Sequence, residues 1–340
     1  MTRRRIGDAV RQATEQNSRR IGLMVTLPIA APFALLLVWP QALGLQRAIV
    51  IAQLIAFRAP LAVFLAVLAV IAGAVALLRR RWGVAAALAL MLGVASMANA
   101  AVLLVRGSAH ASPAGDLVVM SWNMQGGAST PRSAARIALD HGAEVVVLPE
   151  TDADAAAEVA RLMDDGGRPM AAFTTPQEWI PTSALISERL GEYRLDTSVG
   201  TTPVLPSAVL RPIAEGPTIV AAHTAPPLPG SMDEWREGLD WAAARCDEPW
   251  TIMAGDFNAT VDHFEGLGRE GGLLGLCRDA ARDSGAAAAG TWPSTQPGWI
   301  ASPIDHVMAG SKWITAGFRT VGTDGVGSDH LPVIAVLERR

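Results

Sequence analysis

The first hundred residues alternate between long apolar segments and short clusters of arginine. Three of the apolar segments, residues 21–39, 59–78 and 83–105, are long enough to cross a bilayer as helices. A helix of about 20 residues spans about 30 Å, the thickness of a hydrocarbon core. A fourth segment, residues 48–57, is too short to span, so we expect it to be interfacial or re-entrant. The pattern therefore predicts three transmembrane helices.

The arginines predict the orientation of these helices. Six of them lie in the tail of residues 1–20, and three more, at residues 79–81, separate the second and third segments. Basic residues near the ends of membrane spans favour the cytoplasmic side. We therefore expect a multi-pass plasma-membrane protein with a cytoplasmic amino terminus. Everything after residue 105 is then expected to be extracytoplasmic.

The pattern changes after a Gly-, Ser- and Pro-containing linker at residues 106–115, and residues 116–340 are expected to form the functional domain. Short β-branched runs there alternate with Ala-rich stretches of helical period. The helices are too few for a strictly alternating barrel, so the pattern predicts an α/β (α+β) four-layer sandwich, two mixed β-sheets flanked by helices. Strands are expected at residues 117–122, 144–148, 183–187, 203–211, 218–222, 250–254, 304–308, 313–319 and 333–337, and helices at residues 131–140, 153–163 and 232–245.

Composition supports the division of the chain into two parts. Hydrophobic residues make up 50% of it, and the mean hydropathy is +0.28, which is high for a soluble protein. Residues 1–106 carry a net charge of +10, whereas residues 107–340, with 16 basic and 30 acidic residues, carry −14. Because nucleic acids are bound largely through Lys and Arg, the acidic domain disfavours a nucleic-acid partner. Cys246 and Cys277 both lie in this domain, and the sequence is equally compatible with a disulfide and with two separate buried thiols.

Polar residues recur just past the ends of the predicted strands, at the rim where loops meet a sheet and function tends to gather. They are Asn123, Glu150, His223, Asp256 with Asn258, Asp305, and Asp329 with His330. Packing alone does not require so many polar groups at one rim. Carboxylates and imidazoles together can supply acid and base groups and can hold a metal ion.

These residues stand in the motifs Ser-Trp-Asn, Leu-Pro-Glu, Ala-His-Thr, Gly-Asp-Phe-Asn, Ile-Asp-His and Ser-Asp-His. In this order the motifs resemble the endonuclease/exonuclease/phosphatase superfamily, which includes deoxyribonuclease I, abasic-site endonucleases, inositol polyphosphate 5-phosphatases and sphingomyelinases. The resemblance covers about residues 116–340 and implies a hydrolase acting on ester bonds with Mg²⁺ or Mn²⁺ as cofactor. It implies that Glu150, helped by Asn123, holds the ion and that Asp329 is a further metal or supporting carboxylate.

The resemblance also implies catalytic roles. Asp256 would orient or deprotonate the attacking water, and Asn258 and His223 would bind phosphate oxygens. His330, oriented by Asp305, would meet the charge that develops on those oxygens.

Three neighbouring residues carry separate expectations. His306 should face away from Asp305, because adjacent residues of a strand point to opposite sides, and a structural role is expected for it. His263 is expected to be solvated. Trp292 is compatible both with lining the pocket and with packing.

The resulting hypothesis is a membrane-anchored, metal-dependent phosphoesterase that hydrolyses a phosphomonoester or phosphodiester. A lipid-linked or small substrate is preferred, because the domain is tethered to the membrane and is acidic. The first alternative is an exported metal-dependent nuclease of the same family, which a basic groove would favour. The second is a catalytically silent binding domain.

Overall fold

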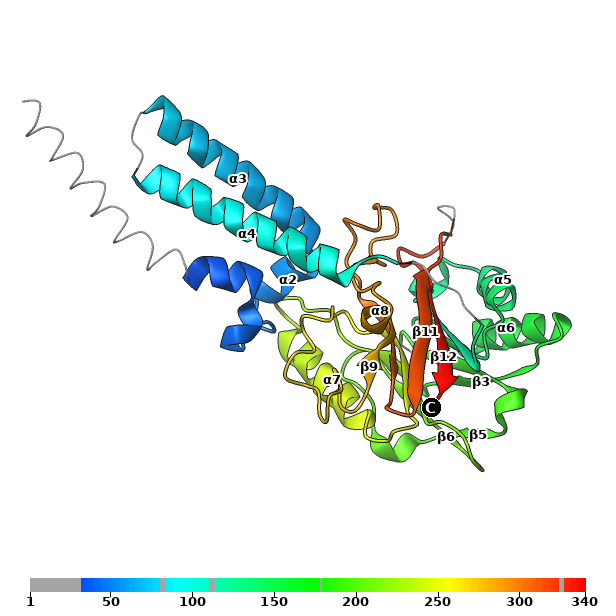
Figure 1. Ribbon diagram of the computed structural model, residues 1–340. Coiled ribbons are helices and arrows are strands. Elements are labelled where there is room, and N and C mark those ends of the chain that lie inside the picture. The colour runs from blue at the N-terminus through cyan, green and yellow to red at the C-terminus, as the bar shows by residue number, and fades with distance from the viewer. Residues whose placement is uncertain (1–31, 80–82, 110–113, 178, 324–326) are drawn as a thin grey trace, which may run out of the picture. The chain divides into compact units, whose positions relative to one another are not determined.

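The computed structural model describes residues 32–79, 83–109, 114–177, 179–323 and 327–340 (Figure 1). The chain forms two compact units, Met1–Leu103 and Leu104–Arg340. Most of the first predicted membrane segment lies outside the described residues, and its end, residues 32–38, is helical.

The first unit is helical. After the 3-10 turn η1 (Pro40–Leu43) come α2 (Ile51–Ala56), α3 (Arg58–Leu78) and α4 (Val84–Arg106). The helices α3 and α4 run antiparallel side by side (Figure 1), and the Ser96 hydroxyl donates to the carbonyl of Ala62 at 2.8 Å. By length and composition each of the two could cross a membrane. The helix α2, with six residues, is too short to span, as expected for residues 48–57.

A buried arginine joins three helical segments of this unit. The Arg58 guanidinium donates to the side-chain oxygen of Asn99 at 2.6 Å and to the carbonyl of Val38 at 3.2 Å. The Asn99 amide nitrogen donates in turn to the carbonyl of Leu37 at 3.2 Å. Because a buried charge is costly unless its hydrogen bonds are met, these contacts fix how α3, α4 and residues 32–38 pack.

The second unit contains two six-stranded mixed sheets. Each has one parallel pair, β1–β2 in the first and β7–β8 in the second, and the other pairs are antiparallel. The first sheet has the order β11 (Trp313–Thr320), β12 (Val333–Arg339), β1 (Leu117–Ser121), β2 (Val145–Leu148), β4 (Ser183–Ser187), β3 (Met170–Thr174). The second has the order β5 (Tyr193–Leu195), β6 (Ala208–Pro212), β7 (Ile219–His223), β8 (Ile252–Asp256), β10 (Asp305–Ala309), β9 (Arg278–Asp279).

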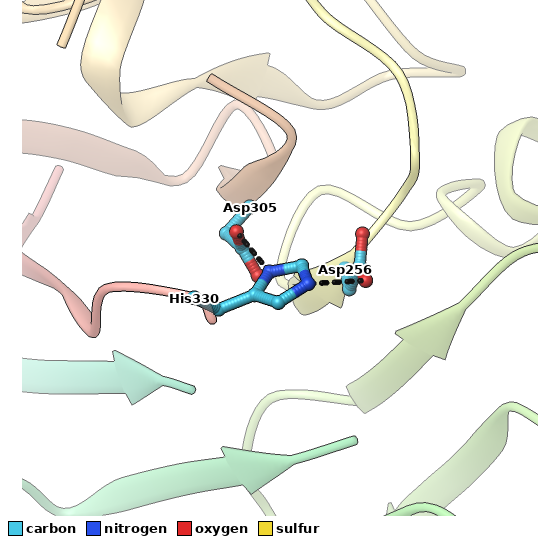
Figure 2. A group of neighbouring side chains, drawn as sticks. All are labelled: Asp256, Asp305 and His330. Carbon is cyan, nitrogen blue, oxygen red and sulfur yellow. Dashed lines mark hydrogen bonds and ion pairs between the residues drawn. The ribbon is translucent and has the colours of Figure 1, made fainter. Parts of the chain in front are cut away.

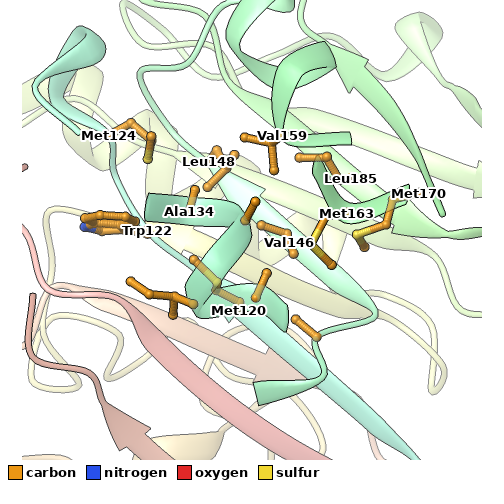
Figure 3. Close-up of a cluster of buried hydrophobic side chains, with 14 of the residues drawn as sticks. Met120, Trp122, Met124, Ala134, Val146, Leu148, Val159, Met163, Met170 and Leu185 are labelled. Atoms are coloured by element: carbon orange, nitrogen blue, oxygen red, sulfur yellow. The ribbon is translucent and has the colours of Figure 1, made fainter. Parts of the chain in front are cut away.

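Helices complete the sandwich. A parallel strand pair needs a crossover, which α5 (Pro131–His141) supplies between β1 and β2 and α7 (Met232–Arg245) between β7 and β8. The helices α5 and α6 (Ala153–Asp165) pack on one face of the first sheet (Figure 3), and the short α8 (Ala280–Asp283) follows β9. The core of that layer includes Met120, Val146, Leu148, Leu185, Val159 and Met163, each worth about 1.5–3 kcal/mol when buried. The predicted fold class is confirmed.

Three strands were not predicted. The strands β5 and β9 have only three and two residues, and β3 has only one buried residue, so none carries a clear alternation of apolar and polar positions. The predicted strand at residues 203–211 begins only at Ala208, because Val204 adopts a positive φ of 67°, which lies outside the range of a β-strand. The strand β8 runs two residues further than predicted and includes Asp256.

Two connections constrain the second unit. Cys246 and Cys277 form a disulfide with Cα atoms 5.8 Å apart, which decides between the two readings of the sequence. Near the beginning of the unit, the Arg106 guanidinium forms two hydrogen bonds of 2.7 Å with the buried carboxylate of Asp262. The backbone N–H groups of residues 287 and 288 donate to the carbonyls of residues 106 and 107. The beginning of the predicted linker is therefore held against the domain.

Candidate active site

The register of the second sheet places three predicted site residues side by side. Asp256, at the end of β8, pairs with His223 at the end of β7 and with Asp305 at the start of β10. Residues opposite each other on adjacent strands point to the same face, about 5 Å apart. Gly255 makes this possible, because a Cβ there would collide with the carbonyl of Ala222. These three side chains therefore gather at one edge of the sheet.

The first sheet supplies the other half of the site. Ser121 of β1 pairs with Val147 of β2 and with Val333 of β12, so the ends of these three strands are neighbours. Asn123, Glu150 and His330 lie within three residues of these positions. Both sheets thus contribute polar side chains to one place, and hydrogen bonds between Asn123 and Asp256 and between His330 and Asp305 join the two halves.

His330 lies between two carboxylates, as Figure 2 shows. Its Nδ1 is 2.9 Å from Oδ2 of Asp305, and its Nε2 is 3.7 Å from Oδ2 of Asp256. All three side chains are buried. Burial lowers the pKa of His330, but the carboxylates of Asp305 and Asp256 outweigh it and raise the pKa to about 10. His330 is therefore a cation at neutral pH, oriented by Asp305 as expected from the sequence.

Asp256 is poised to exchange a proton near neutral pH. Burial raises its pKa to about 7; the charge of His330 opposes this rise, and Asp305 adds to it. Its Oδ1 accepts from the backbone N–H of Asn258 at 2.8 Å. A carboxyl group with a pKa close to the working pH suits a general base.

Asn123 links Asp256 to Glu150. Its amide nitrogen donates to Oε1 of Glu150 at 3.0 Å and to Oδ2 of Asp256 at 3.1 Å. Its oxygen accepts from the backbone N–H of Gln125 at 2.9 Å. Asn123 thus presents a donor rather than an oxygen ligand to this part of the site. Glu150 adopts a φ of 57°, a conformation that costs about 1–3 kcal/mol and is typically retained at functional sites.

His223 is a buried, neutral imidazole at the end of β7. Burial and the positive charge of His330 lower its pKa to about 3. Its Nδ1 is 3.4 Å from the hydroxyl of Thr182, and its Nε2 is 4.0 Å from Oε1 of Glu150. Among the described residues no protein group hydrogen-bonds to that Nε2. The nitrogen is therefore available to a bound group beside Glu150.

Asn258 and Asp329 flank this centre. Asn258 has a φ of 46°, which asparagine tolerates, and its amide nitrogen donates to the carbonyl of Thr224 at 2.9 Å. Oδ1 of Asp329 is 4.0 Å from Nε2 of His330, and its Oδ2 accepts from the indole of Trp292 at 2.8 Å. Trp292 therefore contacts a site residue directly.

His306 occupies the opposite face of β10 from Asp305, as predicted. Its Nδ1 is 2.7 Å from Oδ2 of Asp279, and its Nε2 is 2.9 Å from the carbonyl of Ala259. Burial lowers the pKa of His306, but Asp279 outweighs burial and the net shift is upward. The pair holds the chain just after Asn258. Asp279 lies outside every predicted motif, so only the fold reveals this contact.

The expectation that His263 is solvated is wrong. Its side chain is fully buried, its Nδ1 accepts from the backbone N–H of Thr260 at 2.8 Å, and its ring stands edge-on to Trp235 of α7 at 5.2 Å. The loop after β8 packs beneath α7, which no local pattern indicates. Gln125 and Ser129 were also missed; they accept from the backbone N–H groups of residues 329 and 328 and so fix the segment that carries His330.

The donor set fits a hard divalent cation. Asp256, Asp305 and His330 offer ligand atoms within 4.8 Å of one another. However, His330 is cationic and hydrogen-bonded to Asp305, and a protonated imidazole does not bind metal. Glu150, with its side chain 27% exposed, is the carboxylate with room for an ion. Carboxylate oxygens are the ligands that Mg²⁺ and Mn²⁺ prefer.

Comparison with known proteins places this site in a family. A sequence model described as the endonuclease/exonuclease/phosphatase family matches residues 120–330. A search of curated proteins gives no match. Similar solved structures include an endonuclease/exonuclease/phosphatase from Beutenbergia cavernae DSM 12333, with 20% identity, a TM-score of 0.50, and coverage of 66% of this chain and 72% of that one.

Two further solved structures are among the similar ones. TDP2 of D. rerio, complexed with single-strand DNA product, has 16% identity and a TM-score of 0.49, with coverage of 65% of this chain and 98% of that one. A functionally unknown conserved protein from Enterococcus faecalis V583 has 13% identity and a TM-score of 0.47, with coverage of 66% and 100%. Because the family model spans more than half of the sequence, the chain belongs to the endonuclease/exonuclease/phosphatase family, whose members are metal-dependent hydrolases acting on ester bonds.

Proposed function

We propose that this protein is a membrane-anchored, divalent-metal-dependent phosphoesterase that acts on a lipid-linked or small phosphate ester on the extracytoplasmic side. The observation that carries the proposal is the His330 cation held between Asp305 and Asp256, with Asn123 linking Asp256 to Glu150. Buried positive charge beside a carboxyl group of pKa about 7 is suited to a phosphate and to the water that attacks it.

Each site residue has a separate role in the proposed reaction. Asp256 orients the attacking water and takes its proton, while protonated His330 donates to a phosphate oxygen on which charge accumulates. Asp305 keeps the His330 ring in position at 2.9 Å. Glu150, with Asp329 as a further carboxylate, would hold Mg²⁺ or Mn²⁺, which when bound supplies positive charge to the phosphate oxygens.

Three observations support the location and the substrate class. The helices α3 and α4 are long and apolar enough to cross a membrane, and the arginines before and between the apolar segments favour the cytoplasmic side. The Cys246–Cys277 disulfide is typical of an oxidising compartment outside the cytoplasm. The charge of −14 on residues 107–340 disfavours a polyanion such as DNA.

The activity is tested with the full-length chain in detergent and bis(p-nitrophenyl) phosphate as substrate. We expect hydrolysis with Mg²⁺ or Mn²⁺, loss of it with EDTA, and a fall of at least about 10³-fold in Asp256→Ala and His330→Ala. Asp279→Ala, which removes a buried carboxylate on the other face of the sheet, serves as the control. Activity that survives EDTA, or that is unchanged in both site variants, counts against the proposal.

Substrate class and location need their own measurements. Phospholipids, polyprenyl phosphates, sugar phosphates and oligonucleotides are compared as substrates, and we expect a lipid-linked or small ester to be preferred. Efficient cleavage of plasmid DNA at low salt would instead favour the nuclease alternative. A carboxy-terminal tag is expected to be cut by protease added to intact cells, and protection of the tag would contradict the proposed orientation.

A further inference from the structure

A pocket of about 390 Å³ opens beside the catalytic centre. Three loops form its walls: the one between β1 and α5, the one between β2 and α6, and the one between β3 and β4. Glu150 belongs both to this wall and to the catalytic centre, where Asn123 joins it to Asp256. A group that occupies the pocket therefore lies next to the carboxylate that we assign to the metal ion.

The wall is apolar and acidic. Its charged side chains, Glu150 and Asp152, are both carboxylates, and among the described residues that line it there is no Lys, Arg or His. Because Glu150 is assigned to the metal ion, Asp152 is the carboxylate that repels a second phosphate or any other anion placed here. The rest of the lining consists of small or hydroxyl-bearing residues and of the apolar side chains of Met124, Pro131, Ala155, Trp179, Ile180 and Pro181.

Trp179 is the one aromatic residue among the described residues of this lining. Its side chain is 75% exposed, and the next residue, Ile180, has a positive φ of 47°, which a β-branched residue rarely adopts. Strain of this kind costs about 1–3 kcal/mol and is typically retained near functional sites. An exposed indole beside a pocket offers a flat apolar surface on which a ring can stack.

We propose that this pocket binds the uncharged, apolar organic group of the phosphate ester, with that group packed on Trp179. The inference rests on the proposed function for the position of the phosphate. It adds a selection rule: the group esterified to the phosphate is recognised by apolar contact, and substrates that place a further negative charge there are rejected by Asp152.

Binding of phosphonates tests this rule without requiring turnover. Phenylphosphonate, methylphosphonate and 4-phosphonobenzoate are titrated calorimetrically into the full-length protein in detergent with Mn²⁺. We expect phenylphosphonate to bind about tenfold more tightly than methylphosphonate, and 4-phosphonobenzoate, which adds a carboxylate at the far end of the ring, to bind more weakly than phenylphosphonate. Trp179→Ala should weaken phenylphosphonate binding about fivefold and leave methylphosphonate binding unchanged.

Two further variants test whether the effects are specific to this pocket and to its negative charge. Trp299→Ala removes another exposed tryptophan, 63% exposed and outside the pocket lining, and should leave the phenyl-to-methyl ratio intact. Asp152→Asn keeps a residue type that caps α6 well but removes the charge, and should selectively improve 4-phosphonobenzoate binding.

Three outcomes would overturn the inference: equal affinity for the phenyl and methyl compounds, equal weakening of both by Trp179→Ala, or tightest binding of 4-phosphonobenzoate. The phenyl preference together with an absence of hydrolysis of any ester would support the pocket and refute the proposed function. Hydrolysis of an ester without the phenyl preference would support the proposed function and refute the inference about the pocket.

Discussion

The hydrogen bond between Asp305 and His330 gives the sharpest test of the catalytic centre. Asp305→Asn keeps the size of the side chain but removes the negative charge 2.9 Å from Nδ1 of His330. At that distance two unit charges attract by about 5.7 kcal/mol for an effective dielectric constant of about 20. Removing one partner of a buried ion pair costs about 3–5 kcal/mol in practice, because the other charge stays buried without compensation.

That loss predicts two changes in the kinetics. If the lost interaction energy raises the free energy of the transition state, kcat drops by about 10²- to 10⁴-fold. The pH dependence also shifts. The carboxylates raise the pKa of His330 to about 10, so its cation persists up to that pH in the unaltered protein. Without the charge of Asp305 this pKa falls, and the alkaline limit of activity moves toward neutral pH.

Asp279→Asn is a matched control, because Asp279 is also buried and lies 2.7 Å from a histidine Nδ1, that of His306 on the opposite face of the sheet. Both variants should lower the free energy of unfolding, which is measured by chemical denaturation. Only Asp305→Asn should move the pH–rate profile of bis(p-nitrophenyl) phosphate hydrolysis. An unmoved alkaline limit in Asp305→Asn, or an equal shift in both variants, would refute the reasoning.

Three further predictions concern stability and metal binding. Reducing the disulfide between Cys246 and Cys277, which are 31 residues apart, should lower the unfolding free energy by about 3.7 kcal/mol, measured by denaturation with and without a thiol reductant. Arg106→Gln should cost about 3–5 kcal/mol because its partner carboxylate is buried. Arg161→Gln, whose ion pairs are exposed, should lower the free energy of unfolding far less in the same assay. Glu150→Gln should weaken Mn²⁺ binding at least tenfold by calorimetry, about the effect of losing a charged oxygen ligand, and an unchanged affinity would exclude Glu150 as a ligand.

The sequence singles out the polar residues that the fold brings together, because each stands beside a strongly apolar strand. The runs before Glu150 and His223 are buried throughout, so their ends are evident from the sequence. A local pattern contains no information about which strands become neighbours. The adjacency of His223, Asp256 and Asp305 follows from the sheet order, which puts β10 beside β8 although some fifty residues separate them.

The sequence also does not predict how individual side chains are hydrogen-bonded, because these contacts join segments that are distant in the sequence. The sequence suggests Asn123 as a helper of the metal ligand, but which end of its amide faces Glu150 depends on the backbone N–H of Gln125. The burial of His263 depends on Trp235, which belongs to a different element. Interactions between distant segments decide both, and neither apolar periodicity nor motif spacing encodes them.

The clamp between Arg106 and Asp262 has a practical consequence for protein engineering. A soluble fragment designed by cutting where the apolar sequence stops, at residue 107, would discard the guanidinium and leave Asp262 without its bidentate partner. It would also remove the carbonyl of residue 106, which accepts from the N–H of residue 287. Expression boundaries should therefore begin upstream of Leu104, and the few apolar residues retained with Arg106 are better masked by polar substitution than deleted.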